Sequence, residues 1–154
     1  VTGLQKTLDV LSQGTTSDLS YQPVLAGVFS DLEMVKANLE TMMKESQVPF
    51  NQTEKQNLKV YYAMIIQIKT MVHLAYDCLY VCEGQREKID ESILLPLKTV
   101  IAGLKELDFT DLKKIPQENV VALPEISSHA RLIDNLNRIG LHYGSMIQSL
   151  RLLK

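Results

Sequence analysis

The chain has 154 residues, of which 45% are hydrophobic, and a formal net charge of −2 from 16 basic and 18 acidic side chains. A chain of this size can bury a core without metals or disulfides, so we expect one domain over residues 1–154. Nucleic-acid binders usually carry a basic excess, so the charge balance argues against DNA or RNA binding. No apolar run reaches the roughly 18–20 residues that cross a bilayer, so we predict no membrane insertion.

The first two predicted helices are amphipathic. Apolar residues spaced three and four apart predict a short helix before Gly14 and a long helix between Pro23 and Pro49. In the long helix this apolar stripe consists of Leu25, Val28, Leu32, Val35, Leu39 and Met42.

The third predicted helix begins near Asn51 and ends before Gly84. It has apolar residues over much of its circumference, so we expect it to be the most buried helix. Cys78 and Cys82, four residues apart, are interpreted as small buried residues, because cysteines one turn apart on a helix rarely reach disulfide geometry. A metal-binding thiolate pair or a disulfide to another chain are the alternatives.

The fourth predicted helix runs from about Arg86 to Leu107, with a kink or a restart at Pro96. Residues 108–125 then form the longest connection, which we expect to carry local structure or function. The last helix has the strictest three-four stripe, made of Leu132, Leu136, Ile139, Tyr143, Met146, Leu150 and Leu153.

Two glycines interrupt the last predicted helix. Gly140 and Gly144 should each cost about 1 kcal/mol relative to alanine, so we expect a close packing contact at both. Room for a ligand is the alternative. Together these elements predict an all-α fold, an up-and-down bundle of four long helices with a short N-terminal helix and a long loop before the last helix.

Sequence motifs of catalysis are absent. The chain has no Cys-x-x-Cys, His-Glu-x-x-His, Glu-x-x-His or Gly-x-Ser-x-Gly pattern, and its seven glycines are dispersed. His73 and Asp77 lie four residues apart, and we interpret them as the polar edge of a buried helix. We therefore predict a protein that is not an enzyme and holds no cofactor or metal.

The chemistry that remains is binding. For a protein partner we predict contacts from Phe109 and Leu112 in the 108–125 loop and from the weakly basic outer edge of the last helix, at Arg131, Arg138 and His142. The alternative function is a carrier of a small apolar ligand between the helices, in a pocket formed by Met64, Ile68, Met71 and Tyr143.

The sequence also suggests a processed, secreted protein. It begins at Val1, and Asn51-Gln52-Thr53 fits the glycosylation sequon, which makes Asn51 a candidate glycosylation site. In general character the chain resembles helical cytokines and secreted effectors such as arthropod salivary proteins. The likeness implies a secreted, monomeric effector that modulates immunity, but cytokine bundles have two long crossovers where this chain shows one. A cytoplasmic helical scaffold is the remaining alternative.

Overall fold

The structure, a computed structural model, describes residues 1–13, 21–45, 52–82, 89–108, 110–111, 114–125 and 129–153. Within these ranges the chain forms five α-helices and no strand, which confirms the predicted all-α helical bundle. The helices are α1 (Thr2–Gln13), α2 (Tyr21–Glu45), α3 (Gln52–Val81), α4 (Leu95–Lys105) and α5 (Ala130–Leu150).

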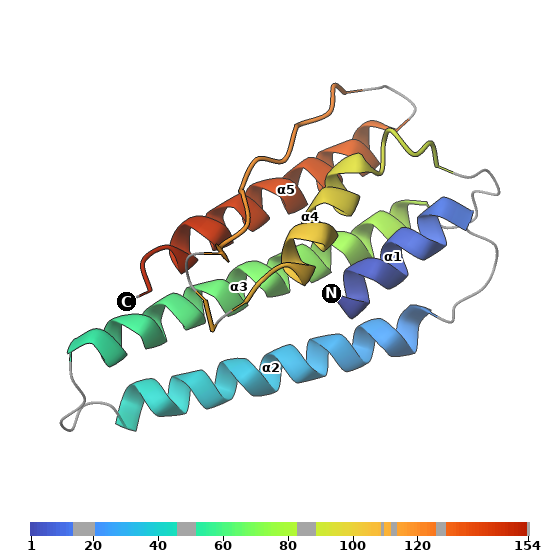
Figure 1. Ribbon diagram of the computed structural model, residues 1–154. Helices are drawn as coiled ribbons and strands as arrows, with labels where there is room; N and C mark the ends of the chain where they lie inside the picture. The colour runs from blue at the N-terminus through green and yellow to red at the C-terminus, as the bar shows by residue number, and fades with distance from the viewer. Residues whose placement is uncertain are drawn as a thin grey trace.

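Helix α3 lies at the centre of the bundle. It contacts α5, α2 and α1, and its most extensive contact is with α5 (Figure 1). Helices α2 and α5 both run antiparallel to α3, and α4 crosses obliquely between α1 and α5. The prediction that the third helix is the most buried one is wrong, because seven of the 30 residues of α3 are buried against ten of the 21 residues of α5. Helix α3 is long, and side chains near its first turns extend past the neighbouring helices and remain exposed.

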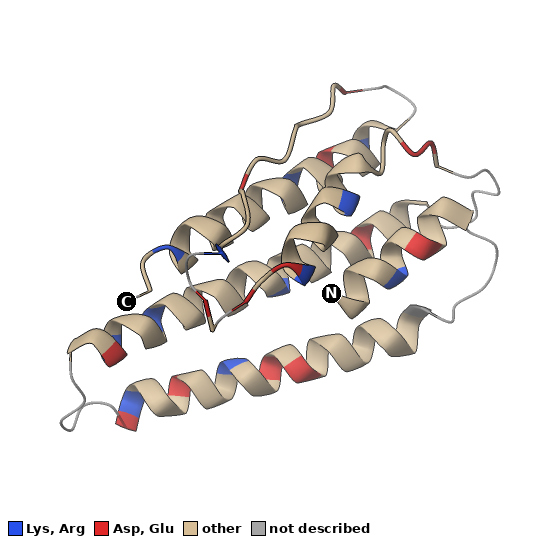
Figure 2. Cartoon of the chain, viewed as in Figure 1, with Lys and Arg blue, Asp and Glu red and all other residues tan. Residues whose placement is uncertain are grey.

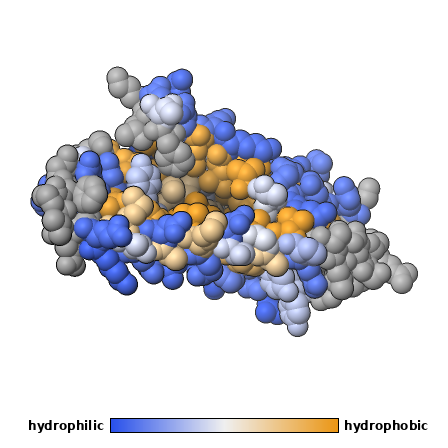
Figure 3. Space-filling view, turned by 90° about the horizontal axis from the view of Figure 1, so that it is seen from below, coloured by the Kyte–Doolittle hydropathy of each residue, from blue (hydrophilic) through white to orange (hydrophobic). Residues whose placement is uncertain are grey.

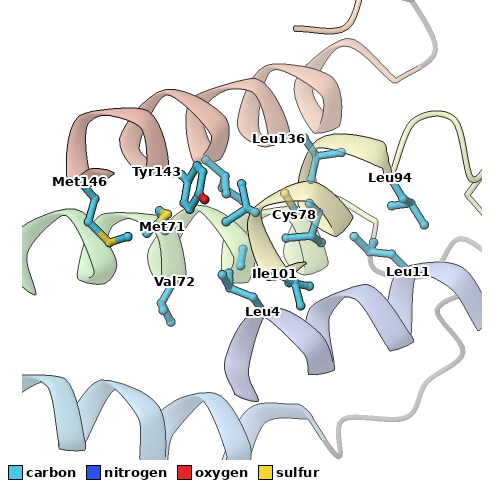
Figure 4. Packing of buried hydrophobic residues seen from close by; sticks show 14 of the residues in the cluster. Leu4, Leu11, Met71, Val72, Cys78, Leu94, Ile101, Leu136, Tyr143 and Met146 are labelled. Carbon is cyan, nitrogen blue, oxygen red and sulfur yellow. The ribbon is translucent and has the colours of Figure 1, made fainter. Parts of the chain in front are cut away.

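The apolar stripe of α5 is buried along its whole length. All seven stripe residues, from Leu132 to Leu153, are 9% exposed or less, as the three-four spacing predicts. Burying each such side chain stabilises the fold by roughly 1.5–3 kcal/mol. Figure 4 shows Leu136, Tyr143 and Met146 of α5 pointing into the same interior as Met71 and Cys78 of α3.

Helix α2 is much less buried than its stripe predicts. Among its described side chains only Leu25 is buried, whereas Val35 and Met42 are 40% and 49% exposed. The reason lies in its neighbours. Of the described helices, α2 contacts α3 and α1, so part of its apolar stripe faces no other helix.

Polar and aromatic side chains link α2 to α3. Glu33 forms an ion pair with Lys69, and the Tyr62 hydroxyl donates to Glu40 Oε1 over 3.2 Å. The Phe29 ring lies 4.4 Å from the His73 ring, measured between centroids. Such half-exposed contacts each contribute about 1 kcal/mol or less, so α2 is held less firmly than α5.

Helix α4 is shorter than the predicted helix over residues 86–107. It begins at Leu95 with Pro96 in its first turn, which confirms the predicted restart at this proline. A proline fits the first turn of a helix, where its missing N–H has no partner to lose, and Ile89 and Asp90 before it are not helical. The Ser92 N–H and hydroxyl both donate to Asp90 Oδ1 at 2.9 Å, which forms a turn before α4 and lowers the pKa of Asp90.

Candidate functional site

An extended segment, residues 114–125, lies along α5; we call it the strap. Asn137 holds it at one point, because its side-chain Oδ1 accepts from Leu123 N–H at 3.0 Å and its Nδ2 donates to Leu123 O at 3.1 Å. Further along, the Tyr143 hydroxyl donates to Gln117 O over 3.3 Å. The predicted long connection is thus ordered over this part by hydrogen bonds to α5.

The two glycines of α5 differ in their contacts with the strap. A β-carbon at Gly140 would lie 2.9 Å from Val120 Cγ1, so the strap needs a glycine there and the predicted close contact is confirmed. At Gly144 the nearest atom would be Glu118 O at 3.7 Å, an ordinary contact. The prediction of a close contact at Gly144 is therefore wrong, because the strap lies farther from the helix there.

A shallow hollow of about 380 Å³ lies between the strap and α5. Val121 of the strap and Leu141 of α5 line it, and their side chains are 74% and 71% exposed. Small and polar residues make up most of the remaining lining, including Ala122, Gly144 and Ser145. The hollow therefore has an exposed apolar pair within a mostly small or polar border.

The structure separates the predicted basic edge of α5 into two parts. Arg131 and Arg138 are exposed, and Arg138 Nε pairs with Asp134 Oδ2 at 3.1 Å. His142 is half-buried instead, with its Nδ1 2.5 Å from Gln67 Oε1 of α3. Figure 2 shows Lys and Arg interspersed with Asp and Glu over the helices that are drawn in colour.

Three of the predicted site residues lie outside the described residues. These are Phe109 and Leu112, predicted to contact a partner, and Asn51, the candidate glycosylation site.

The predicted ligand pocket is partly assembled. Met64, Ile68 and Met71 line one cavity of about 410 Å³ among α1, α2, α3 and α4. Tyr143 lies elsewhere, buried in the core with its hydroxyl against Gly103 of α4, where even a β-carbon would overlap it. Its pKa is raised by burial and, to a smaller extent, by the charge of Glu106.

Cys78 and Cys82 are both buried, as predicted, and neither forms a disulfide. Burial, the proximity of Cys82 and a smaller effect of Asp77 raise the pKa of the Cys78 thiol, although a hydrogen bond with Asn135 opposes the shift. Burial raises the pKa of Cys82 to about 11. Both sulfurs are therefore neutral thiols at neutral pH and poor nucleophiles.

In the described part of the chain, no group of three or more His, Cys, Asp or Glu residues is placed to hold a metal ion. His73 and Asp77 are both exposed, whereas the neighbouring Cys78 is buried. None of the described helices is both long and apolar enough to cross a membrane.

Comparison of the chain with protein-family models, with curated proteins and with solved structures gave no match.

The sequence patterns did not indicate Val121 and Leu141, the exposed pair at the hollow, because a single apolar residue on a loop or on an outer helix face carries no signal. They also did not indicate Asn137 or Gly103. Asn137 looks like any polar residue on a helix, and Gly103 like a residue of low helix propensity. Their roles depend on segments distant in the sequence, Leu123 for Asn137 and Tyr143 for Gly103. For Gly103 the available signal was a glycine inside a helical pattern, which indicates a close packing contact, as at Gly140.

Proposed function

We propose that this protein is a non-enzymatic interaction protein that binds another protein through the surface formed by the strap and α5. The observation that carries the proposal is the exposed pair Val121 and Leu141, which meets at one hollow. Protein interfaces commonly centre on apolar anchors within a polar rim. One of the predicted arginines of α5, Arg138, lies beside this surface, because it is three residues, about one turn, before Leu141.

Secretion is part of the same proposal. It is supported by the sequon at Asn51 and by the general likeness to secreted effectors. The proposed partner is therefore an extracellular or cell-surface protein, and a role in immune modulation belongs to this hypothesis.

The test uses a photo-crosslinking amino acid placed at position 121 or 141, with the protein incubated in extracellular fluid of the source organism. We expect the same polypeptide to be crosslinked from both positions and not from Ala37, an exposed residue of α2. Unlabelled protein should compete, and the variant Leu141→Arg should not.

Leu152→Arg is the matched control, because Leu152 is also a leucine of high exposure, 66%, and does not line the hollow. Neither change should alter stability by more than about 0.5 kcal/mol, because both side chains are exposed. If Leu141→Arg competed as well as the control, the strap–α5 surface would be the wrong site. An obligate dimer in light scattering would instead favour the scaffold hypothesis.

A further inference from the structure

A groove between α2 and α3 continues beyond the N-terminal end of α1; we call it the α2–α3 groove. Two cavities lie along it, one of about 410 Å³ beside the first residues of α1 and one of about 370 Å³ between the last turn of α2 and the first turns of α3. Figure 3 views the face on which α2 lies and shows apolar atoms gathered at a hollow in the middle of the molecule, with hydrophilic side chains around it. Helices α2 and α5 lie on different sides of α3, so this groove is separate from the strap–α5 surface.

The two cavities lie on the same side of both helices. On α3 their apolar lining residues continue one three-four row, made of Leu58, Tyr61, Met64, Ile68 and Met71. On α2 the same spacing leads from Val28 and Leu32 in one cavity, through Val35, to Met42 in the other. Residues with this spacing share one face of a helix. At a rise of about 1.5 Å per residue, the row on α3 is about 20 Å long.

Helix α1 shows what kind of element this groove accommodates. It packs against both α2 and α3, and a β-carbon at Gly3 would lie 3.4 Å from Leu25 Cδ2 and 3.5 Å from Val28 Cγ1. Helix α1 has 12 residues, whereas α2 and α3 have 25 and 30, so α1 covers only part of their length. Its first residues, Val1 and Thr2, line the larger cavity. The rest of the groove leaves Val35 and Met42 of α2 exposed by 40% and 49%.

The charges at the larger cavity do not select an occupant. Its lining includes the carboxylate of Asp31 and also Val1, whose amino group is a cation of opposite charge. The two charges offset each other, so this end of the groove favours neither a cation nor an anion. What it offers is apolar surface.

The smaller cavity is different, because two carboxylates line it. Glu45 of α2 and Glu54 of α3 belong to its lining, together with three apolar or aromatic residues. No Lys or Arg is among the described residues that line it, and Lys44 and Lys55 lie beside these glutamates in the sequence but outside the lining. A cation is therefore attracted to this end of the groove, next to apolar surface.

We propose that the α2–α3 groove binds an amphipathic helix of a protein partner, with its apolar side between α2 and α3 and a Lys or Arg residue at Glu45 and Glu54. The occupant is a helix because α1 already packs in the adjoining part of the groove, and because a row of about 20 Å corresponds to about four helical turns. An amphipathic helix that lays its apolar face into a groove is a recurring mode of recognition. The proposal is independent of the strap–α5 surface.

The experiment measures the binding of fluorescent peptides to the full chain by anisotropy. The first peptide has about 16 residues, which span about 24 Å as a helix, with leucines spaced three and four apart among Ala and Gln and two lysines in its last turn. The second has glutamates in place of these lysines, and the third has a central proline that interrupts the helix.

We expect the lysine peptide to bind saturably, with one peptide per chain. The glutamate peptide should bind at least about fivefold more weakly, because its charge meets Glu45 and Glu54. The proline peptide should bind at least about tenfold more weakly, because it cannot form a continuous helix. Absence of saturable binding, or equal affinities for the lysine peptide and either of the others, would overturn the proposal.

A substitution on α2 locates the peptide. Met42→Lys removes an apolar contact and adds a like charge, so it should weaken binding of the lysine peptide by at least about fivefold. Met34→Lys is the matched control and should leave binding unchanged, because Met34 is a methionine of the same helix, 59% exposed, and lines neither cavity. Equal affinities of the two variants would place the peptide elsewhere. If light scattering showed a dimer that Met42→Lys dissociates, a second copy of the chain would be the occupant and the proposal would be wrong.

A pair of charge-neutralising substitutions tests the basic end of the partner helix. With Glu45→Gln and Glu54→Gln together, the preference for the lysine peptide over the glutamate peptide should fall from at least about fivefold to less than about twofold. The control combines Asp77→Asn and Glu125→Gln, which remove two exposed carboxylates outside the groove and should leave the preference unchanged. Circular dichroism checks that both double variants are folded. An unchanged preference in the folded Glu45→Gln, Glu54→Gln variant would contradict the proposal.

Discussion

Replacement of Gly103 by alanine tests the contact between α4 and α5. The added β-carbon would overlap the Tyr143 hydroxyl oxygen and lie 2.7 Å from Tyr143 Cζ. Tyr143 is 1% exposed, so a movement of its ring would displace core side chains. Overpacking of this kind typically costs about 1–3 kcal/mol. Displacement of the ring also breaks the hydrogen bond to Gln117 O, which is worth about 1 kcal/mol.

The helix propensity of alanine opposes this loss. Alanine is favoured over glycine in a helix interior by about 0.5–1 kcal/mol. The expected net result of Gly103→Ala is a loss of about 1–3 kcal/mol in the free energy of unfolding. For a chain of this length each kcal/mol lowers Tm by about 2–4 °C. Urea unfolding followed by circular dichroism measures the loss directly.

Gly27→Ala is the matched control. A β-carbon at Gly27 of α2 has no atom within 4 Å, so only the helix propensity changes. We expect this variant to be more stable than the wild type by about 0.5–1 kcal/mol. The same chemical change should therefore have opposite signs in α4 and α2.

A double variant identifies the clash as the cause. Tyr143→Phe removes the hydroxyl that overlaps the new β-carbon, so Gly103→Ala should cost less in its presence, by about 1 kcal/mol or more. The reasoning is refuted if Gly103→Ala is as stable as the wild type, or if the two changes are strictly additive.

Three further predictions concern the core, the strap and the thiols. Leu136→Ala should cost about 2–5 kcal/mol in urea unfolding, because Leu136 is fully buried, and a loss below about 0.5 kcal/mol would contradict its place in the stripe. Asn137→Ala should cost about 1–3 kcal/mol in the free energy of unfolding, because it leaves the Leu123 N–H and carbonyl without their partner. Hydrogen exchange of the Leu123 amide should accelerate in this variant, and unchanged protection would contradict the contact. Cys78 and Cys82 should resist Ellman's reagent in the native protein at pH 8 and react after unfolding. Because their folded pKa values are raised from an unfolded value near 9.0, stability should fall as pH rises above 9.0, and a urea midpoint that rose over this range would contradict the assignment.

Only part of the candidate surface followed from local sequence, since its exposed pair, Val121 and Leu141, did not. The glycines in the last helix indicate that another segment approaches α5 closely, and at Gly140 this segment is the strap, through Val120. The spacing of residues does not identify Val120 as the contact. His142 was placed on the outer edge of the last helix because it follows Arg138 by four residues. In the structure it contacts Gln67 of α3, because the angular position of α3 around α5 brings that edge into contact.

The sequence by itself determined the helical fold, the burial of the α5 stripe and the restart of α4 at Pro96. These properties depend on the 3.6-residue period of the helix and on the chemistry of single residues, which act over one or two turns. Only the tertiary structure decided which stripes are covered. The stripes of α2 and α5 have the same three-four spacing, yet Met42 is 49% exposed and Met146 is buried. The spacing of apolar residues defines the apolar side of a helix, but the segments that pack against that side are distant in the sequence. The cavity beside α2 and the strap on α5 therefore appear only when the helices are assembled.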